Sequence, residues 1–229
     1  MNTLQSNSLS YRFRSKNLIE NVSLTFRQGH LYTILGPNGS GKSTFLKAVC
    51  GIWRPTSGSV LWNAEDLSQK NRREISKLIS FVASASQTYF EYSVEEVVAM
   101  GRYAYLDDSS EQSDNYIVKE AMRELDVLYL KERCISELSS GERQRVYLAQ
   151  ALTTEASVLL LDEPTSSLDV RHQRELWSCL KRLCAQGKIV AITTHDLAAA
   201  AEHGDSFAVM QQGRCVYQGE DLSAAKAKL

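Results

Sequence analysis

The chain has 229 residues, of which 43% are hydrophobic and 23% charged, and its formal net charge is −1. This length supports one full hydrophobic core, and the near-neutral charge provides no polybasic face, so we do not expect nucleic acid as a partner. Because there is no signal-peptide pattern, no apolar run long enough to cross a bilayer and no metal-ligand spacing among the five cysteines, we expect a cytosolic protein or one at a membrane's cytosolic face, without disulfides or zinc.

The first motif along the chain is a glycine-rich loop that follows a short apolar run at residues 31–35, typical of a buried strand. The loop contains Gly36, Pro37, Asn38, Gly39, Ser40, Gly41, Lys42, Ser43 and Thr44. Its backbone N–H groups are suited to surround phosphates, while Lys42 reaches the β- and γ-phosphates and Ser43 coordinates Mg²⁺. We expect a helix from Lys42 to about Cys50. A chance glycine-rich turn is the alternative, but the strand–loop–helix order favours a nucleotide-binding protein.

Between Gln87 and Arg133 the apolar residues recur with helical spacing, which predicts a helical insert. Small and polar residues then open another helix near residue 139. Ser139 and Ser140 are both suitable caps, with Glu142 or Arg143 just beyond. The residues by themselves leave the role of this helix start open.

A continuous apolar run at residues 158–161 predicts a central parallel strand, and it ends at Asp162 and Glu163. Successive side chains of a strand point in different directions, so one carboxylate can hold Mg²⁺ while the other addresses a water beside the γ-phosphate. We assign Asp162 to Mg²⁺ and Glu163 to the water. The alternative, a solvated acidic turn, does not explain why a hydrophobic strand ends there.

Residues 189–194 predict another buried strand, which ends at His195. In open α/β sheets the ligand binds outside the carboxyl ends of the strands, so His195 is expected near the phosphates as a polariser or sensor of the γ-phosphate. A histidine at a strand end is by itself more often structural. The other motifs favour a functional role here.

The order of these motifs over nearly the whole chain resembles the ATP-binding subunit of ABC transporters, in which an LSGGQ-type segment corresponds to residues 138–142. The resemblance implies an α/β fold with a P-loop NTPase (RecA-like) core, a mostly parallel sheet, an N-terminal antiparallel β subdomain and an inserted α-helical subdomain. The whole chain would be one domain, with residues 1–86 and 155–229 in the core and 87–154 in the helical subdomain. ATP and Mg²⁺ are the implied ligands, and ATP hydrolysis is the implied activity.

Members of this family pair head to tail, which implies a second ATP-binding subunit whose nucleotide this chain contacts. The implied contacts come from Ser139, Ser140, Gly141, Glu142 and Asp169. Gln87 corresponds to the Q-loop glutamine and would join Ser43 and Asp162 around Mg²⁺, and His195 corresponds to the switch histidine. Ser140 and Glu142 depart from the family's glycine and glutamine, so we expect hydrolysis to survive at an altered rate.

An aromatic residue before the first strands stacks on adenine in this family. Tyr11 is our assignment, and Phe13 is the alternative if the local loop differs in length. A core role for either ring is equally consistent with the sequence.

Residues 93–103 resemble the helical segment of importer ATPases that serve iron–siderophore, haem and vitamin B12 permeases. This implies membrane permease subunits and, indirectly, an extracytoplasmic solute-binding protein. A permease helix would enter the groove near residues 87–92, where Tyr89, Phe90 or Tyr92 would contact it if exposed. The alternatives are a soluble ABC-type ATPase switch that moves no solute and a different P-loop enzyme. A GTPase is disfavoured because no Asn-Lys-x-Asp element is evident.

Overall fold

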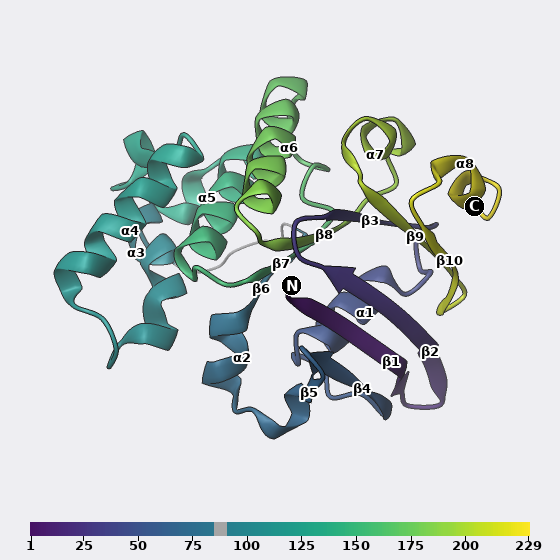
Figure 1. The fold of residues 1–229 in the computed structure, drawn as a ribbon. Coiled ribbons are helices and arrows are strands. Elements are labelled where there is room, and N and C mark those ends of the chain that lie inside the picture. The colour runs from purple at the N-terminus through teal and green to yellow at the C-terminus, as the bar shows by residue number, and fades with distance from the viewer. Residues whose placement is uncertain (85–90) are drawn as a thin grey trace.

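Two β-sheets and a group of helices make up the computed structural model, which describes residues 1–84 and 91–229 (Figure 1). The smaller sheet is antiparallel and has the order β2 (Lys16–Arg27), β1 (Thr3–Phe13), β4 (Ser57–Trp62), β5 (Glu65–Asp66). The larger sheet has the order β10 (Arg214–Gly219), β9 (Ser206–Gln211), β3 (Leu31–Leu35), β8 (Ile189–Thr193), β7 (Val158–Asp162), β6 (Ile79–Val82). Its pairs are parallel apart from the β10–β9 edge.

The helices cover both faces of the larger sheet and form a separate lobe at one side. They are α1 (Lys42–Val49), α2 (Arg72–Leu78), α3 (Val94–Ala99), α4 (Glu111–Glu124), α5 (Ser140–Thr153), α6 (Val170–Ala185), α7 (Leu197–His203) and α8 (Leu222–Lys226). Short 3-10 turns complete them: η1 (Leu67–Gln69), η2 (Met100–Tyr105), η3 (Leu128–Leu130) and η4 (Ile135–Glu137). No helix in the described part of the chain has the length and hydrophobicity needed to span a membrane.

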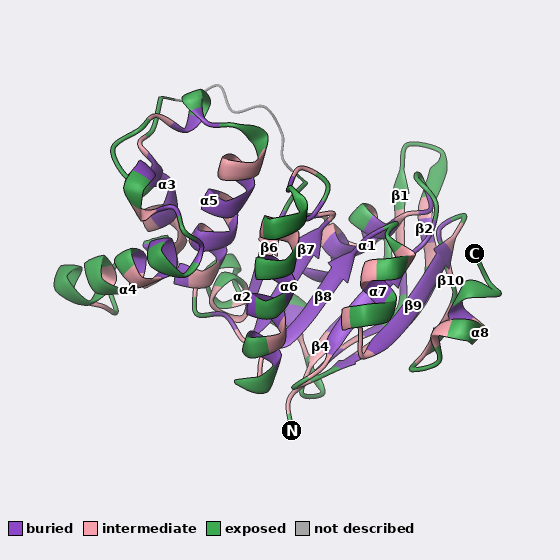
Figure 2. Ribbon diagram, turned by 90° about the horizontal axis from the view of Figure 1, so that it is seen from above, coloured by how far each residue is buried: buried purple, intermediate pink, exposed green. Residues whose placement is uncertain are grey.

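The central strands are buried on both faces, as Figure 2 shows for β7 and β8. In β3, Tyr32 and Ile34 join the core cluster that contains α1, while Leu31 and Leu35 point into clusters on the opposite face. This alternation follows from the two-residue period of a strand. It places α1 between the two sheets and α6 and α7 on the other face of the larger sheet (Figure 1).

The predicted central elements are confirmed with small changes at their ends. Strand β3 covers residues 31–35, β7 extends by one residue to Asp162, and β8 ends at Thr193. Helix α1 ends at Val49, after which Gly51 takes a left-handed backbone conformation with φ +74°. Helices α3, α4 and α5 lie where helical periodicity predicted them. The predicted α/β fold with an N-terminal antiparallel sheet is therefore correct.

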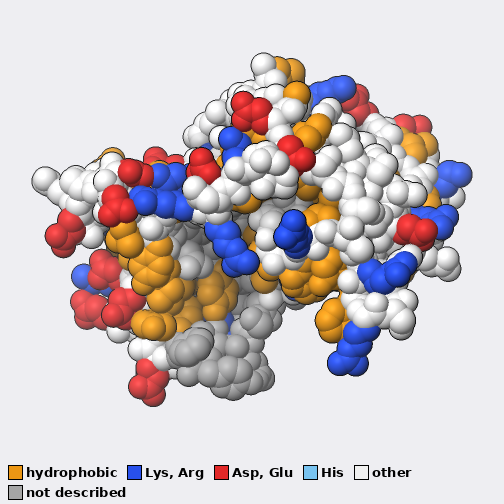
Figure 3. All heavy atoms as spheres, turned by 90° about the horizontal axis from the view of Figure 1, so that it is seen from below, with side chains coloured by type: hydrophobic (Ala, Val, Ile, Leu, Met, Phe, Trp, Pro, Cys, Tyr) orange, Lys and Arg blue, Asp and Glu red, His pale blue; other side chains and the backbone are white. Residues whose placement is uncertain are grey.

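A groove of about 620 Å³ separates the helical lobe from the two-sheet core. Figure 3 shows hydrophobic side chains around a hollow on this face, with Lys and Arg side chains nearby. The apolar lining includes Ile52 and Ile75 from the core side and Met100 and Tyr103 from the helical side, and Arg72 adds a cation. The groove is therefore mainly apolar with a basic edge.

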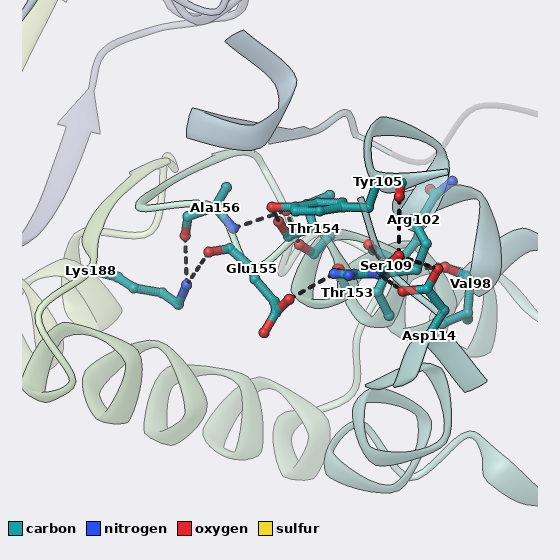
Figure 4. Close-up of polar contacts among 12 residues, drawn as sticks. Val98, Arg102, Tyr105, Ser109, Asp114, Thr153, Thr154, Glu155, Ala156 and Lys188 are labelled. Carbon is teal, nitrogen blue, oxygen red and sulfur yellow. Dashed lines mark hydrogen bonds and ion pairs between the residues drawn. The ribbon is translucent and has the colours of Figure 1, made fainter. Parts of the chain in front are cut away.

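Within the helical lobe, Arg102 of η2 links α4 to the end of α5 (Figure 4). Its side chain is buried, with 5% of the residue exposed, and donates to Asp114 Oδ1 at 2.7 Å, Glu155 Oε2 at 2.8 Å and the carbonyl of Thr153 at 2.8 Å. The ring of Tyr105 lies 4.0 Å from its guanidinium carbon. The C-terminal carbonyls of a helix lack intrahelical partners, so this cation satisfies one of them and complements the helix dipole.

We expect Arg102→Met to lower the free energy of unfolding by about 3 kcal/mol, because it leaves the Asp114 carboxylate and a helix carbonyl without their partner. Urea denaturation followed by tryptophan fluorescence measures this. Arg123→Met is the matched control, since Arg123 pairs with Glu120 on the surface of α4, and exposed pairs contribute less than about 1 kcal/mol. Equal effects of the two substitutions would contradict the structural role assigned to Arg102.

Candidate nucleotide-binding site

The glycine-rich loop lies between the carboxyl end of β3 and the start of α1. Gly36 has φ +147°, and a Cβ atom there would lie 2.2 Å from the carbonyl oxygen of Met210. Only glycine fits this close approach. The turn between β9 and β10 also contacts the loop, because the N–H of Gly213 donates to the carbonyl of Ser40 at 2.9 Å.

The loop has free groups suited to an anion. Helix α1 begins after Gly41 without a side-chain cap, so its first N–H groups are available at the positive end of the helix dipole. Pro37, Asn38 and Gly39 are exposed, and so is Ser43. The hydroxyl of Ser40 is buried and has no hydrogen-bond partner within the described residues. These features fit a phosphate group.

Lys42 is the cation of this loop. Its Nζ donates to the carbonyls of Gly36 at 2.7 Å and Pro37 at 3.1 Å. Burial lowers the pKa of Lys42, and the carboxylates of Glu163 and Asp162 partly oppose this by raising it. The ammonium therefore lies within the electrostatic field of both carboxylates predicted to act on the phosphates.

Thr193 orients those two carboxylate residues, a role that our sequence analysis missed. Its hydroxyl donates to Asp162 Oδ1 at 2.7 Å and accepts from the N–H of Glu163 at 2.9 Å. Glu163 has φ +46°, a conformation uncommon for residues other than glycine and one found at functional sites. Thr193 is a buried hydroxyl residue at the last position of β8, where it pairs with Asp162. Its role could be recognised only once the pairing of β7 with β8 was known.

His195 follows β8 and lies beside the Glu163 carboxylate. Its Nδ1 is 3.7 Å from Glu163 Oε2, and 67% of its side chain is exposed. The carboxyl ends of β7 and β8 thus bring together Asp162, Glu163 and His195, the three residues that the sequence placed at one edge of the sheet.

The LSGGQ-type segment lies elsewhere in the molecule. Figures 1 and 2 both place α5 with the helical lobe and α1 beside the strands of the core. Ser139 caps α5, and its side chain accepts from the N–H of Glu142. Ser140 is exposed, and a Cβ atom on Gly141 would lie 3.2 Å from the carbonyl of Ser167. Among the described residues, no hydrogen bond joins residues 138–142 to the glycine-rich loop of the same chain.

Asp169 caps α6, where its Oδ1 accepts from the N–H of His172 at 2.9 Å. This hydrogen bond is the main reason that the pKa of Asp169 is lowered. Gln87 lies outside the described residues, as do Tyr89 and Phe90. Tyr92 is partly exposed at the entrance to α3.

The two candidate adenine-stacking residues differ in their surroundings. Tyr11 stacks on Trp53, with ring centroids 5.1 Å apart and an interplanar angle of 15°, and it packs against the core cluster between the sheets. Phe13 is 55% exposed at the end of β1, with the Arg14 guanidinium 5.5 Å from its ring centre. Phe13 is therefore the more exposed of the two rings.

A family model and individual relatives among known proteins match this chain and indicate the same family. Residues 19–166 match the model of the ABC transporter family. The chain is 36% identical over 222 residues to the hemin import ATP-binding protein HmuV of Shewanella denitrificans, covering 94% of this chain and 87% of the relative. It is 38% identical over 213 residues to the cobalamin import ATP-binding protein BtuD of Halobacterium salinarum, covering 93% of this chain but 54% of the relative. The chain thus spans about half the length of that protein.

Solved structures agree with this match. An ATP-binding subunit of an ABC transporter superposes with a TM-score of 0.87 over 98% of this chain and 92% of that one, at 24% identity, which shows the shared fold. An inward-facing putative metal-chelate type ABC transporter has a TM-score of 0.81 and 28% identity, covering 96% of this chain and 84% of that one. The chain therefore belongs to the ABC transporter family, among its ATP-binding subunits.

Proposed function

We propose that the chain binds Mg²⁺-ATP and hydrolyses it to ADP and phosphate, and that this powers an ABC importer. The observation that carries the proposal is the convergence of Lys42, Asp162, Glu163 and His195 at one edge of a parallel sheet, beside a glycine-rich loop with free N–H groups. Positioning and electrostatic stabilisation supply most of the catalysis of phosphoryl transfer. These residues are suited to both.

Each residue has a distinct role in this proposal. Lys42 exchanges the loop carbonyls for the β- and γ-phosphates, and Glu163 accepts a proton from the attacking water. Ser43, Asp162 and Gln87 would hold Mg²⁺, which would neutralise phosphate charge. His195 stabilises the γ-phosphate.

The start of α5 lies in the helical lobe and the glycine-rich loop lies in the core, which supports a head-to-tail dimer. In it, Ser139 and the Gly141 N–H of one subunit bind the γ-phosphate of the ATP on the other, with Ser140, Glu142 and Asp169 close by. Each ATP would then contact both subunits, so nucleotide state would set their separation. The apolar groove beside η2 would receive a helix from a membrane permease and transmit this movement.

A metal chelate of the iron–siderophore, haem or cobalamin kind is the proposed cargo class, supported by the similarity to hemin and cobalamin import proteins. The further partners would be permease subunits and an extracytoplasmic solute-binding protein, with this chain at the cytosolic face of the membrane. A soluble ABC-type switch is the second candidate. An importer subunit should be recovered in the washed membrane fraction and should leave that fraction when the permease is deleted. A soluble switch should be absent from the membrane fraction in both cases.

The ATP-dependent head-to-tail dimer is called the clamp. We expect Glu163→Gln to reduce ATP hydrolysis at least about 100-fold, because the attacking water loses its base. The same variant should form a dimer that requires Mg²⁺-ATP, measured by light scattering. Adding Ser139→Ala should raise the ATP concentration needed for dimerisation about 10-fold through the loss of a charge-assisted hydrogen bond. A protein that binds ATP but stays monomeric would contradict a clamp that forms without the permease subunits.

Ser139→Ala also removes a helix cap, and the chain offers a matched control for that effect. Ser93 caps α3 with the same pattern of contacts, so Ser93→Ala removes an equivalent cap at another position. We expect it to leave ATP-dependent dimerisation of the Glu163→Gln protein unchanged.

For adenine binding, we assign the stacking ring to Phe13 in place of Tyr11. Phe13→Ala should weaken ATP binding about 10-fold, since base–aromatic stacking contributes about 1–3 kcal/mol, and Phe13→Tyr should preserve it. Tyr11→Leu should change ATP affinity less than about 2-fold while lowering thermal stability, because it removes the stack on Trp53. Calorimetric titration in the Glu163→Gln background measures the affinities, and the reverse pattern would restore Tyr11 as the stacking residue.

A further inference from the structure

Two capping boxes in this chain have the same residues and the same contacts. At α3, Glu96 Oε2 accepts from the N–H of Ser93 at 2.7 Å and from its hydroxyl at 2.8 Å. At α5, Glu142 Oε2 accepts from the N–H of Ser139 at 2.9 Å and from its hydroxyl at 2.7 Å. Both are ordinary helix caps. Only the α5 serine, however, is needed for the proposed contact with the partner's ATP.

A serine hydroxyl has one hydrogen to donate. In Ser139 that hydrogen is directed to the Glu142 carboxylate, and the hydroxyl oxygen accepts from the Glu142 N–H at 3.3 Å. A phosphate oxygen accepts hydrogen bonds and cannot donate one. Ser139 must therefore release the carboxylate before it can donate to a γ-phosphate.

The carboxylate would also lie close to the phosphate. Glu142 Oε2 is 2.7 Å from Ser139 Oγ, so with the carboxylate in this position a phosphate oxygen hydrogen-bonded to the same Oγ would lie at most about 5.5 Å from it. Like charges at this separation repel each other, most strongly where water is excluded. Within the described residues no ion pair joins Glu142 to a cation: Arg143 donates to the carbonyl of Leu138 and Arg145 to that of Asp126. The more distant charges of Arg133 and Arg145 make only a small contribution to lowering the pKa of Glu142.

The carboxyl is held in its charged form. The hydroxyl of Ser139, and then its N–H, lower the pKa of Glu142 below its usual range. The positive end of the α5 dipole acts in the same direction. Glu142 is therefore a charged acceptor, and hydrogen bonds to charged groups are about twice as strong as neutral ones.

We propose that the Glu142 carboxylate competes with the γ-phosphate of the partner's ATP for the Ser139 hydroxyl, and so raises the ATP concentration at which two subunits close. This inference rests on the proposed head-to-tail site. It changes the role of Glu142 from a nucleotide contact to a residue that opposes closure. The family's glutamine at this position would accept the same N–H without the charge.

The test compares Glu142→Gln with its matched control, Glu96→Gln, each in the Glu163→Gln background. Both substitutions keep an oxygen acceptor for the capped serine and remove one charge from a helix start. We expect Glu142→Gln to lower the ATP concentration for half-maximal dimerisation at least about fivefold, measured by light scattering with Mg²⁺-ATP. Glu96→Gln should leave it unchanged. Thermal unfolding of all three proteins verifies that they are folded.

The outcomes separate this inference from the proposed function. If the Glu163→Gln protein dimerises and Glu142→Gln does not change the ATP requirement, or changes it no more than Glu96→Gln does, the competition is refuted and the clamp stands. If only the Glu142→Gln protein dimerises, the competition is supported in its strongest form. If no variant dimerises although each binds ATP, both the clamp and the competition are refuted.

Discussion

The parallel register of β3, β8 and β7 is the constraint on which the candidate site depends. Ile34 pairs with Thr193, and Thr193 pairs with Asp162, so these strands end at the same edge of the sheet. The residues that follow them are the glycine-rich loop, Glu163 and His195. A shift of one residue in any pairing would turn these side chains to the other face of the sheet and separate the cation from the carboxylates.

The two ends of α5 in the helical lobe have different contacts. Its N-terminus carries Ser139, and its C-terminus is held by Arg102 through the Thr153 carbonyl. Arg102 belongs to η2, which also lines the apolar groove through Met100 and Tyr103. The helical side of the groove and the LSGGQ-type segment therefore belong to one packed unit, so in the proposed complex a permease helix that shifts this side of the groove would move Ser139 as well.

Ser139 and Lys42 each have a structural contact or environment that would oppose the role proposed for them. At Ser139 the contacts that cap a helix are the ones that the partner's nucleotide would need, whereas Ser93 has the same cap without that second demand. At Lys42 burial disfavours the charge that phosphate binding needs, and the nearby carboxylates restore part of it. Under the proposed function, the hydrogen bonds of Ser139 to Glu142 and of Lys42 to the loop carbonyls would both be exchanged when a nucleotide binds.

Local pattern determined the identity and placement of the main elements. The apolar runs predicted β3, β7 and β8, and the residues directly after them predicted the loop, the carboxylate pair and His195, because strand periodicity and sequence adjacency need no long-range information. Only the tertiary structure revealed the role of Thr193 and the packing of Tyr11 on Trp53, since these contacts join residues about 30 and 40 positions apart. Such contacts depend on strand register and on how the elements pack, which no local pattern specifies.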